Sequence, residues 1–146
     1  MADKMGPGPA TNNIRTLLYF LGERIDANLA QRRKGTPYAA VRPSDVRTFV
    51  SAARRTKSIS QIARELGISR QSAQASVHRL IELGVLILDA ATENKREKRV
   101  VVTAKGQLAN KTAAEQIWAE EAAMAAVIGR DNLEQLRSWL EMLLRP

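Results

Sequence analysis

The chain has 146 residues, no cysteine and a single histidine, and its 23 lysines and arginines outnumber its 15 acidic residues to give a net charge of +8. This length favours one domain with helical extensions. The lack of cysteine excludes disulfides and thiol-based redox sensing, and one histidine cannot build a metal site. No apolar stretch approaches the roughly 18 residues of a membrane span, and none near the N-terminus resembles a secretory signal. We therefore expect a cytoplasmic protein with no cofactor and no membrane partner.

The basic excess is concentrated in the middle of the chain. Residues 42–105 carry thirteen lysines and arginines against six acidic residues, whereas residues 106–146 have a net charge of −2. A concentrated basic surface is typical of proteins that meet phosphates, because neutralising phosphates releases condensed counterions. The charge distribution therefore favours double-stranded DNA as a partner of the central segment.

The first predicted element is a helix over residues 12–33, which follows a leader (residues 1–11) whose glycines and prolines predict disorder. Aliphatic residues recur along this helix at steps of three and four and form one apolar stripe. They are Ile14, Leu17, Leu18, Leu21, Ile25 and Leu29. Basic residues suit the end of the helix, and Gly35 and Pro37 then break the chain.

Three further helices are predicted before residue 85. The first runs from Arg42 to about Arg55, has Pro43 in its first turn, and is expected to bury Val46, Phe49, Val50 and Ala53. A short helix over residues 61–66 is capped by Ser58 or Ser60 and ended by Gly67. The next runs over residues 70–83, from its cap at Ser69 to Gly84.

Two strands and two helices complete the expected order. Residues 85–88 and 99–102 are β-branched or aliphatic runs on either side of a charged loop, which predicts a hairpin. Thr103 is expected to cap an alanine-rich helix that runs to about Val127, where Gly129 breaks the chain. Asp131 is expected to cap the last helix.

The strongest motif is SISQIARELGISRQSAQASVHRLIELGVL at residues 58–86. A helix-turn-helix needs a small residue where its helices touch and a residue that tolerates positive φ at the turn, and Ala63 and Gly67 occupy these places. Apolar residues are expected to lock the two helices together. They are Ile62, Leu66, Ile68, Ala73, Val77 and Leu80.

Helical geometry then indicates which side chains face outward from the second helix of this motif. At 100° per residue, one polar side lies opposite the apolar anchors. Arginine and glutamine suit the edges of guanine and adenine, and a serine at a helix N-terminus suits a phosphate. His78 has either a solvated role or a contact with DNA, and Arg79 either contacts a phosphate or pairs with a carboxylate. The candidate DNA-binding residues here are Ser69, Arg70, Gln71, Ser72, Gln74, His78 and Arg79.

The loop of the predicted hairpin carries four cations, Lys95, Arg96, Lys98 and Arg99. Such a loop is either a solvated turn or a wing that lays cations into the minor groove. Its position directly after the helix-turn-helix favours the wing, and we add Lys95, Arg96 and Lys98 to the candidate DNA-binding residues.

The first and last helices carry apolar stripes with no obvious partner in a small winged core. Unpartnered stripes usually mark an interface, although these helices could instead fold back on their own core. Trp118 and Trp139 are expected to pack in the core or at this interface. A symmetric dimer would hold two recognition helices about 34–36 Å apart on a pseudo-palindromic site. The candidate dimerisation residues are Ile14, Leu17, Leu18, Leu21, Leu133, Leu136 and Leu140.

These segments resemble the MarR family, the multiple-antibiotic-resistance regulators. VRPSDVRTF (residues 41–49), the helix-turn-helix with Arg79, Leu80 and Gly84, and VVVTAKGQL (residues 100–108) are similar to the corresponding family segments, and the resemblance covers most of the chain. It implies a homodimeric winged-helix repressor whose Arg70, Gln71, Ser72 and Gln74 read the major groove and whose Arg96 reads the minor groove. Asn94 departs from the family, which commonly has aspartate there, and Ala75 replaces a basic or polar residue.

The resemblance also implies a small anionic or phenolic effector, bound between the dimer helices and the DNA-binding lobe. Arg15, Tyr19 and Arg24 are the sequence candidates for lining such a pocket.

The sequence therefore predicts a mainly α protein with a small β-hairpin, an α+β winged helix-turn-helix flanked by dimerisation helices. Its parts are the leader 1–11, a helix and linker 12–41, the DNA-binding domain 42–106 and the C-terminal helices 107–146. The predicted function is a sequence-specific transcriptional regulator, with two alternatives: a winged helix used for protein–protein contact, or a DNA-binding protein of replication or mobile-element control. An enzyme is not expected, because the usual nucleophile–base pairs and a glycine-rich phosphate loop are missing.

Overall fold

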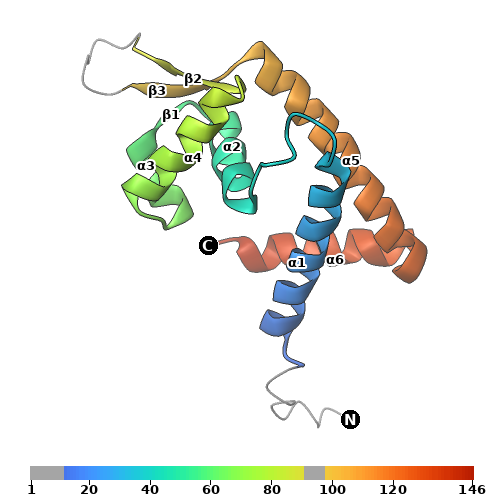
Figure 1. Cartoon of the computed structure of the whole chain (residues 1–146). Coiled ribbons are helices and arrows are strands. Elements are labelled where there is room, and N and C mark those ends of the chain that lie inside the picture. The colour runs from blue at the N-terminus through green and yellow to red at the C-terminus, as the bar shows by residue number, and fades with distance from the viewer. Residues whose placement is uncertain (1–11, 91–97) are drawn as a thin grey trace, which may run out of the picture.

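The structure is a computed structural model that describes residues 12–90 and 98–146. Its helices are α1 (Ile14–Arg33), α2 (Pro43–Arg54), α3 (Ile59–Leu66), α4 (Arg70–Glu82), α5 (Ala104–Ile128) and α6 (Arg130–Leu144). Its strands are β1 (Lys57–Ser58), β2 (Leu86–Asp89) and β3 (Arg99–Val102). A winged-helix lobe of α2, α3, α4 and the sheet lies to one side of the long helices α1, α5 and α6 (Figure 1). The predicted fold class is confirmed.

The sheet has one more strand than the predicted hairpin. β2 and β3 pair antiparallel from Leu86 opposite Val102 to Asp89 opposite Arg99, and β1 pairs with the other edge of β3, which gives the order β1-β3-β2. β1 has only two residues, too few to show an alternating pattern in the sequence. It forms where the extended chain that leads into α3 runs alongside β3.

Helices α3 and α4 form the predicted helix-turn-helix. Ser58 caps α3 in a capping box: its hydroxyl accepts from the Gln61 amide at 3.3 Å while the Gln61 side chain accepts from the Ser58 amide at 2.9 Å. Gly67 makes the turn with φ of 63°, and Ala63 is buried beside it. Ile68 differs from the prediction, because its side chain is 37% exposed and does not lock the helices together.

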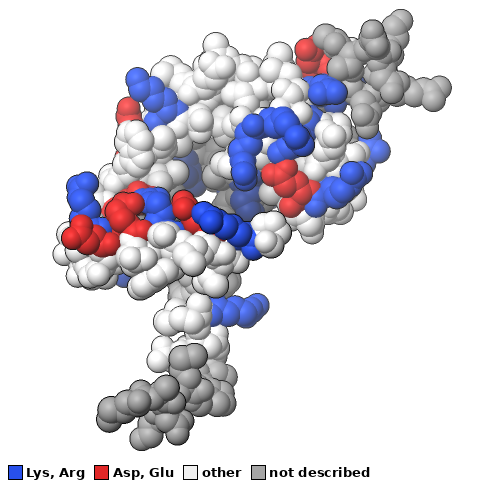
Figure 2. All heavy atoms as spheres, turned by 180° about the vertical axis from the view of Figure 1, so that it is seen from behind, with Lys and Arg blue, Asp and Glu red and all other residues white. Residues whose placement is uncertain are grey.

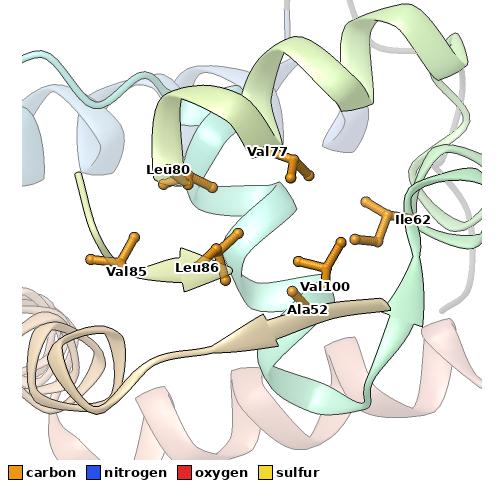
Figure 3. Close-up of a cluster of buried hydrophobic side chains, with 7 residues drawn as sticks. All are labelled: Ala52, Ile62, Val77, Leu80, Val85, Leu86 and Val100. Carbon is orange, nitrogen blue, oxygen red and sulfur yellow. The ribbon is translucent and has the colours of Figure 1, made fainter. Parts of the chain in front are cut away.

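The core of the lobe holds α4 by its inner face (Figure 3). Val77 and Leu80 of α4 meet side chains from α2, α3 and both strands of the hairpin. The buried cluster consists of Ala52, Ile62, Val77, Leu80, Val85, Leu86 and Val100. Burying an aliphatic side chain contributes about 1.5–3 kcal/mol, so this cluster fixes which side of α4 faces solvent.

The buried side of α2 is not the predicted one. Val46, Val50 and Ala53 are exposed and Phe49 is half-buried, whereas the helix buries Asp45, Thr48, Ser51 and Ala52. The polar side chains can be buried because each has a partner: Thr48 donates to the Ser44 carbonyl at 3.0 Å, and Ser51 accepts from Lys57. The apolar stripe of α2 faces a cavity instead.

Helix α5 begins tightly against the base of the hairpin. Thr103 caps it as predicted: its hydroxyl accepts from the Gly106 amide at 3.0 Å and donates to the Gly84 carbonyl at 2.6 Å. A Cβ added at Gly106 would overlap the carbonyl oxygen of Val85 and lie 2.8 Å from Val102 Cγ1. The joint between the lobe and α5 therefore requires glycine at this position.

Polar contacts join the three long helices. Glu120 of α5, only 7% exposed, accepts from Asn28 at 2.9 Å and from Arg32 Nη2 at 2.8 Å, both on α1. Arg137 of α6 pairs with Glu121 of α5 at 2.8 Å. In the part of the chain that the structure describes, none of the helices could span a membrane.

The start of α6 differs from the prediction in one detail. Gly129, with φ of 88°, precedes the helix, and Asp131 lies within the first turn instead of capping it. A carboxylate in this turn faces the positive end of the helix dipole, which explains why its position resembled a cap in the sequence.

Candidate nucleic-acid interface

The outer side of α4 is exposed, as the helical spacing predicted. The helix buries Ala73, Ser76, Val77 and Leu80. Its exposed residues are Arg70, Gln71, Ser72, Gln74, Ala75 and His78. The amides of the two glutamines and the guanidinium of Arg70 can each form paired hydrogen bonds with a base edge in a major groove.

The N-terminal turn of α4 is ordered by a pair of serines. The Ser69 hydroxyl accepts from the Ser72 amide at 3.0 Å and donates to the Ser72 hydroxyl at 2.8 Å. Both residues are exposed, so this turn presents hydroxyls and the positive end of a helix dipole to solvent. That combination suits a phosphate oxygen.

Arg79 forms the carboxylate pair that was one of its two predicted roles. Its Nη2 lies 2.7 Å and its Nε 3.1 Å from Oδ1 of Asp45, whose side chain is 2% exposed. Burial alone would raise the pKa of Asp45, but hydrogen bonds from Arg79, the Arg42 backbone and Ser76 outweigh it and hold the pKa below its ordinary value. The hydrogen bond with Asp45 raises the pKa of Arg79 in turn. Arg79 thus ties α4 to α2 through its Nε and Nη2.

The predicted wing is described only at its base. Lys95, Arg96 and Asn94 lie outside the described residues, so their assigned roles remain predictions. Lys98 is exposed directly before β3, and Arg99, also exposed, begins that strand opposite Asp89 of β2. The loop end of the hairpin therefore carries cations on the same lobe as α4.

A group of cations at the end of α2 was not singled out in the sequence. Arg54, Arg55 and Lys57 surround a shallow hollow together with Glu65. Lys57 is buried: its ammonium group donates to the Ser51 carbonyl at 2.8 Å and pairs with Glu65. This pairing lowers the pKa of the Glu65 carboxyl. Figure 2 shows lysines and arginines gathered over this lobe, while acidic side chains gather elsewhere on the same face. The net charge of residues 42–105 was the sequence signal for this surface.

A largely apolar cavity of about 240 Å³ lies between the lobe and the long helices. Val46, Phe49 and Val50 of α2 form one wall. Leu29 and Arg33 of α1 and Ala109, Ala113 and Ile117 of α5 contribute to the others. The Nε of Arg33 is buried and has no hydrogen-bond partner in the part of the chain that the structure describes. Arg33, a lining residue of the cavity, therefore has a buried donor for which the described part of the chain supplies no acceptor.

The three residues predicted to line such a pocket do not line this one. Arg24 lies nine residues before Arg33, which places it on the opposite face of α1. Arg15 and Tyr19 share the face of Arg33 but lie roughly 20–27 Å further along the helix axis. The lining residues could not be read from a pattern in the sequence, because the walls come from distant parts of the chain.

Most of the candidate dimerisation residues are exposed. On α1, Ile14, Leu17, Leu18 and Leu21 do not fold back on the chain's own core. On α6, Leu136 and Leu140 are half-buried, but Leu133 is only 8% exposed and packs within the chain, so it is not available to a second copy. The more exposed apolar residues of α6 are Trp139, Met142, Leu143 and Leu144. Trp118 is 67% exposed and Trp139 55%, so neither is a core residue.

A winged helix-turn-helix with an exposed polar helix, one long helix before it and two after it, is the architecture that the resemblance to the MarR family implied. The model of the MarR family matches residues 48–97 of this sequence. The search of curated proteins with this sequence found no match. The family is one of transcriptional regulators, which are not enzymes.

Solved structures with the same fold cover nearly the whole chain. The transcriptional repressor CouR bound to a 23-mer DNA duplex is 20% identical over 98% of this chain and 100% of that one, with a TM-score of 0.74. A probable transcriptional regulator from Pseudomonas aeruginosa is 18% identical over 93% and 100%, with a TM-score of 0.73. A MarR family protein from Mycobacterium tuberculosis in complex with salicylic acid is 17% identical over 90% and 96%, with a TM-score of 0.70. The resemblance predicted from the sequence is confirmed, and the fold is that of MarR-family transcriptional regulators.

Proposed function

We propose that this protein is a cytoplasmic, sequence-specific DNA-binding repressor that binds a pseudo-palindromic operator as a homodimer and releases it when a small molecule occupies the apolar cavity. One observation carries the proposal: the exposed polar side of α4 is held outward by a buried core on the lobe that bears most of the positive charge.

The DNA contacts are assigned from the exposed positions. Arg70, Gln71, Ser72 and Gln74 enter the major groove, with His78 further along the same side. Ser69 at the helix N-terminus meets a phosphate, and the wing residues Lys95, Arg96 and Lys98 meet the minor groove. CouR, which has the same fold, was solved bound to a DNA duplex, and this supports duplex DNA as the partner.

The homodimer is proposed from the exposed apolar side chains of α1 and α6. A single chain leaves Leu17, Leu18 and Trp139 largely in water, and a second copy would bury them. Two lobes related by a two-fold axis would then present two copies of α4 to successive turns of one DNA face.

The effector is proposed from the chemistry of the cavity. Its aliphatic and aromatic walls favour an apolar body, and the unpartnered Nε of Arg33 favours one anionic group on that body. The structure of a relative in complex with salicylic acid, a molecule of this kind, supports the same class of ligand.

Selection of bound sequences from random duplex DNA tests the proposal. We expect enrichment of a pseudo-palindrome with half-sites about 10 base pairs apart. Gln71→Ala should weaken binding to the selected site by about 10- to 100-fold, because a paired contact with one base discriminates by about 1–3 kcal/mol. Gln135→Ala, the same change at an exposed position of α6, should bind like the wild type. Failure to enrich any sequence would contradict DNA reading and favour a protein partner for the lobe.

A further inference from the structure

Asp45 both lines the cavity and pairs with a residue of α4. Asp45 is one of the residues that line the apolar cavity. Its Oδ1 also receives Nη2 and Nε of Arg79 from α4 at 2.7 and 3.1 Å. One buried side chain therefore joins the wall of the cavity to the helix that carries the candidate base-reading residues.

Both partners of this pair are held on their other sides as well. Oδ2 of Asp45 accepts from the Arg42 amide at 3.1 Å, which fixes the carboxylate to the first turn of α2. Nη2 of Arg79 also donates to the buried hydroxyl of Ser76 at 3.0 Å, which fixes the guanidinium to α4. Hydrogen bonds weaken steeply when distance or angle departs from the optimum, so a displacement of α2 relative to α4 breaks part of this set.

The cavity is built so that an occupant pushes on α2. Val46 and Val50 of α2 line the cavity and are 38% and 46% exposed, so a guest would contact them directly. Leu80 and Val85 also line the cavity, but both belong to the buried core of the lobe and are only 3% exposed. Because packed interiors resist compression, a guest that presses on these side chains displaces α2 as a unit, together with the buried Asp45 on the same helix.

We infer that the Asp45–Arg79 pair is the contact that couples occupancy of the cavity to the orientation of α4. Both residues act as positioning residues. Arg79 follows His78 directly and lies five residues after Gln74 on α4. A movement of Asp45, to which Arg79 is bound, would therefore tilt the exposed side of this helix. The inference rests on the proposed function and adds to it the residues that transmit the response.

A double-mutant cycle tests this coupling without knowledge of the natural effector. Ala113→Phe places a benzyl group in the cavity wall as a covalent stand-in for an occupant, and Asp45→Asn removes the charge of the pair while keeping its shape. The four proteins of the cycle are titrated with the selected DNA at one salt concentration, and their melting temperatures are recorded. Ala122→Phe, an exposed position on the opposite face of α5, is the matched control.

We expect Ala113→Phe to lower DNA affinity at least tenfold when the pair is intact and less than threefold when Asp45 is asparagine. Loss of general stability would leave the two effects additive, so the non-additivity separates positioning from folding. Arg79→Lys, which keeps the charge but loses the forked contact, should reproduce the uncoupling if Asp45→Asn fails to fold.

Three outcomes would overturn the inference. Additive effects, or an Ala113→Phe variant that folds and binds DNA like the wild type, overturn the coupling and leave DNA binding standing. A wild type that selects no DNA sequence overturns the proposed function and the coupling together.

Discussion

Gly106 has no side chain, and this allows the first turn of α5 to pack closely against the winged lobe. The first turn of α5 packs so closely on the chain entering β2 that a methyl group would meet the carbonyl oxygen of Val85 and a methyl of Val102. Thr103 fixes the same turn through its bond to the Gly84 carbonyl. The direction of α5 relative to the lobe therefore depends on close backbone contact at one point.

Gly106→Ala should lower the free energy of unfolding by about 1–3 kcal/mol, because the added Cβ forces a backbone shift in a packed joint. Urea unfolding monitored by circular dichroism measures it. Gly22→Ala on α1 is the matched control: a Cβ there meets nothing within 4 Å, and alanine should stabilise the helix by up to about 1 kcal/mol. Equal stability of Gly106→Ala and wild type would contradict the tight joint.

At the scale of single elements, Glu120 is the contact by which α5 holds α1. The hydrogen bond from Asn28, followed by that from Arg32, lowers the pKa of the Glu120 carboxyl. A carboxylate whose pKa is lower in the folded state stabilises the fold at pH values above its ordinary pKa of 4.5. That contribution is lost as the pH falls through the lower, folded value. Asp45 and Glu65, whose pKa values are also lowered, act in the same direction.

The free energy of unfolding should therefore fall as the pH is lowered from about 5 to 3. Glu120→Gln should show a shallower fall, because glutamine cannot be protonated in this range. Urea titrations at half-unit steps of pH measure both slopes. The same slope for the variant and the wild type would show that the Asn28–Arg32–Glu120 contact does not contribute to stability.

The elements differ in how well the sequence predicts them. The caps at Ser69 and Thr103 were predicted, and Ser58 was one of two candidates for the cap of α3, since a cap depends on residues three positions apart. The buried side of α2 was predicted wrongly because it depends on distant partners: Arg79 and Lys57 make it possible to bury Asp45 and Ser51. Strand β1 was missed because it exists only by pairing with β3, forty residues later.

Part of the candidate site could likewise be predicted from local sequence and part could not. The exposed side of α4 follows from local helical spacing and was predicted residue by residue, except that Arg79 was left with two roles. The resemblance implied a pocket between the long helices and the lobe, but its lining residues, Arg33 among them, were not predicted, because α1, α2 and α5 come together only in the folded chain. A pattern within one helix cannot show what another helix will place against it.

At the scale of the whole molecule, the long helices leave several large apolar side chains exposed to water. Ile14, Leu17 and Leu18 of α1 and Leu143 and Leu144 of α6 are each more than 40% exposed. Scattered exposed leucines are normal, but contiguous rows on helices that flank a DNA-binding lobe are typical of an interface.

The wild type should therefore elute in sizing experiments at micromolar concentration at twice its mass of 16.1 kDa. Leu17→Asp should shift it toward the monomer, because a charge cannot be buried without a partner. Ile87→Asp, at an equally exposed aliphatic residue of β2, should remain dimeric. A monomeric wild type that still bound a palindrome tightly would contradict the role given to α1 and α6.

The cavity and the exposed side of α4 share no residue. The cavity takes its walls from the apolar stripe of α2 and from α1 and α5, whereas the outer side of α4 consists of residues 70, 71, 72, 74, 75 and 78. Under the proposed function, substitutions at Phe49 or Ile117 would change which molecule the cavity binds without changing which DNA sequence is bound, and substitutions at Gln71 would do the reverse. The specificity for the small molecule and the specificity for DNA could therefore evolve separately. Each could also be redesigned separately in a biosensor, provided that Asp45 and Arg79 are kept.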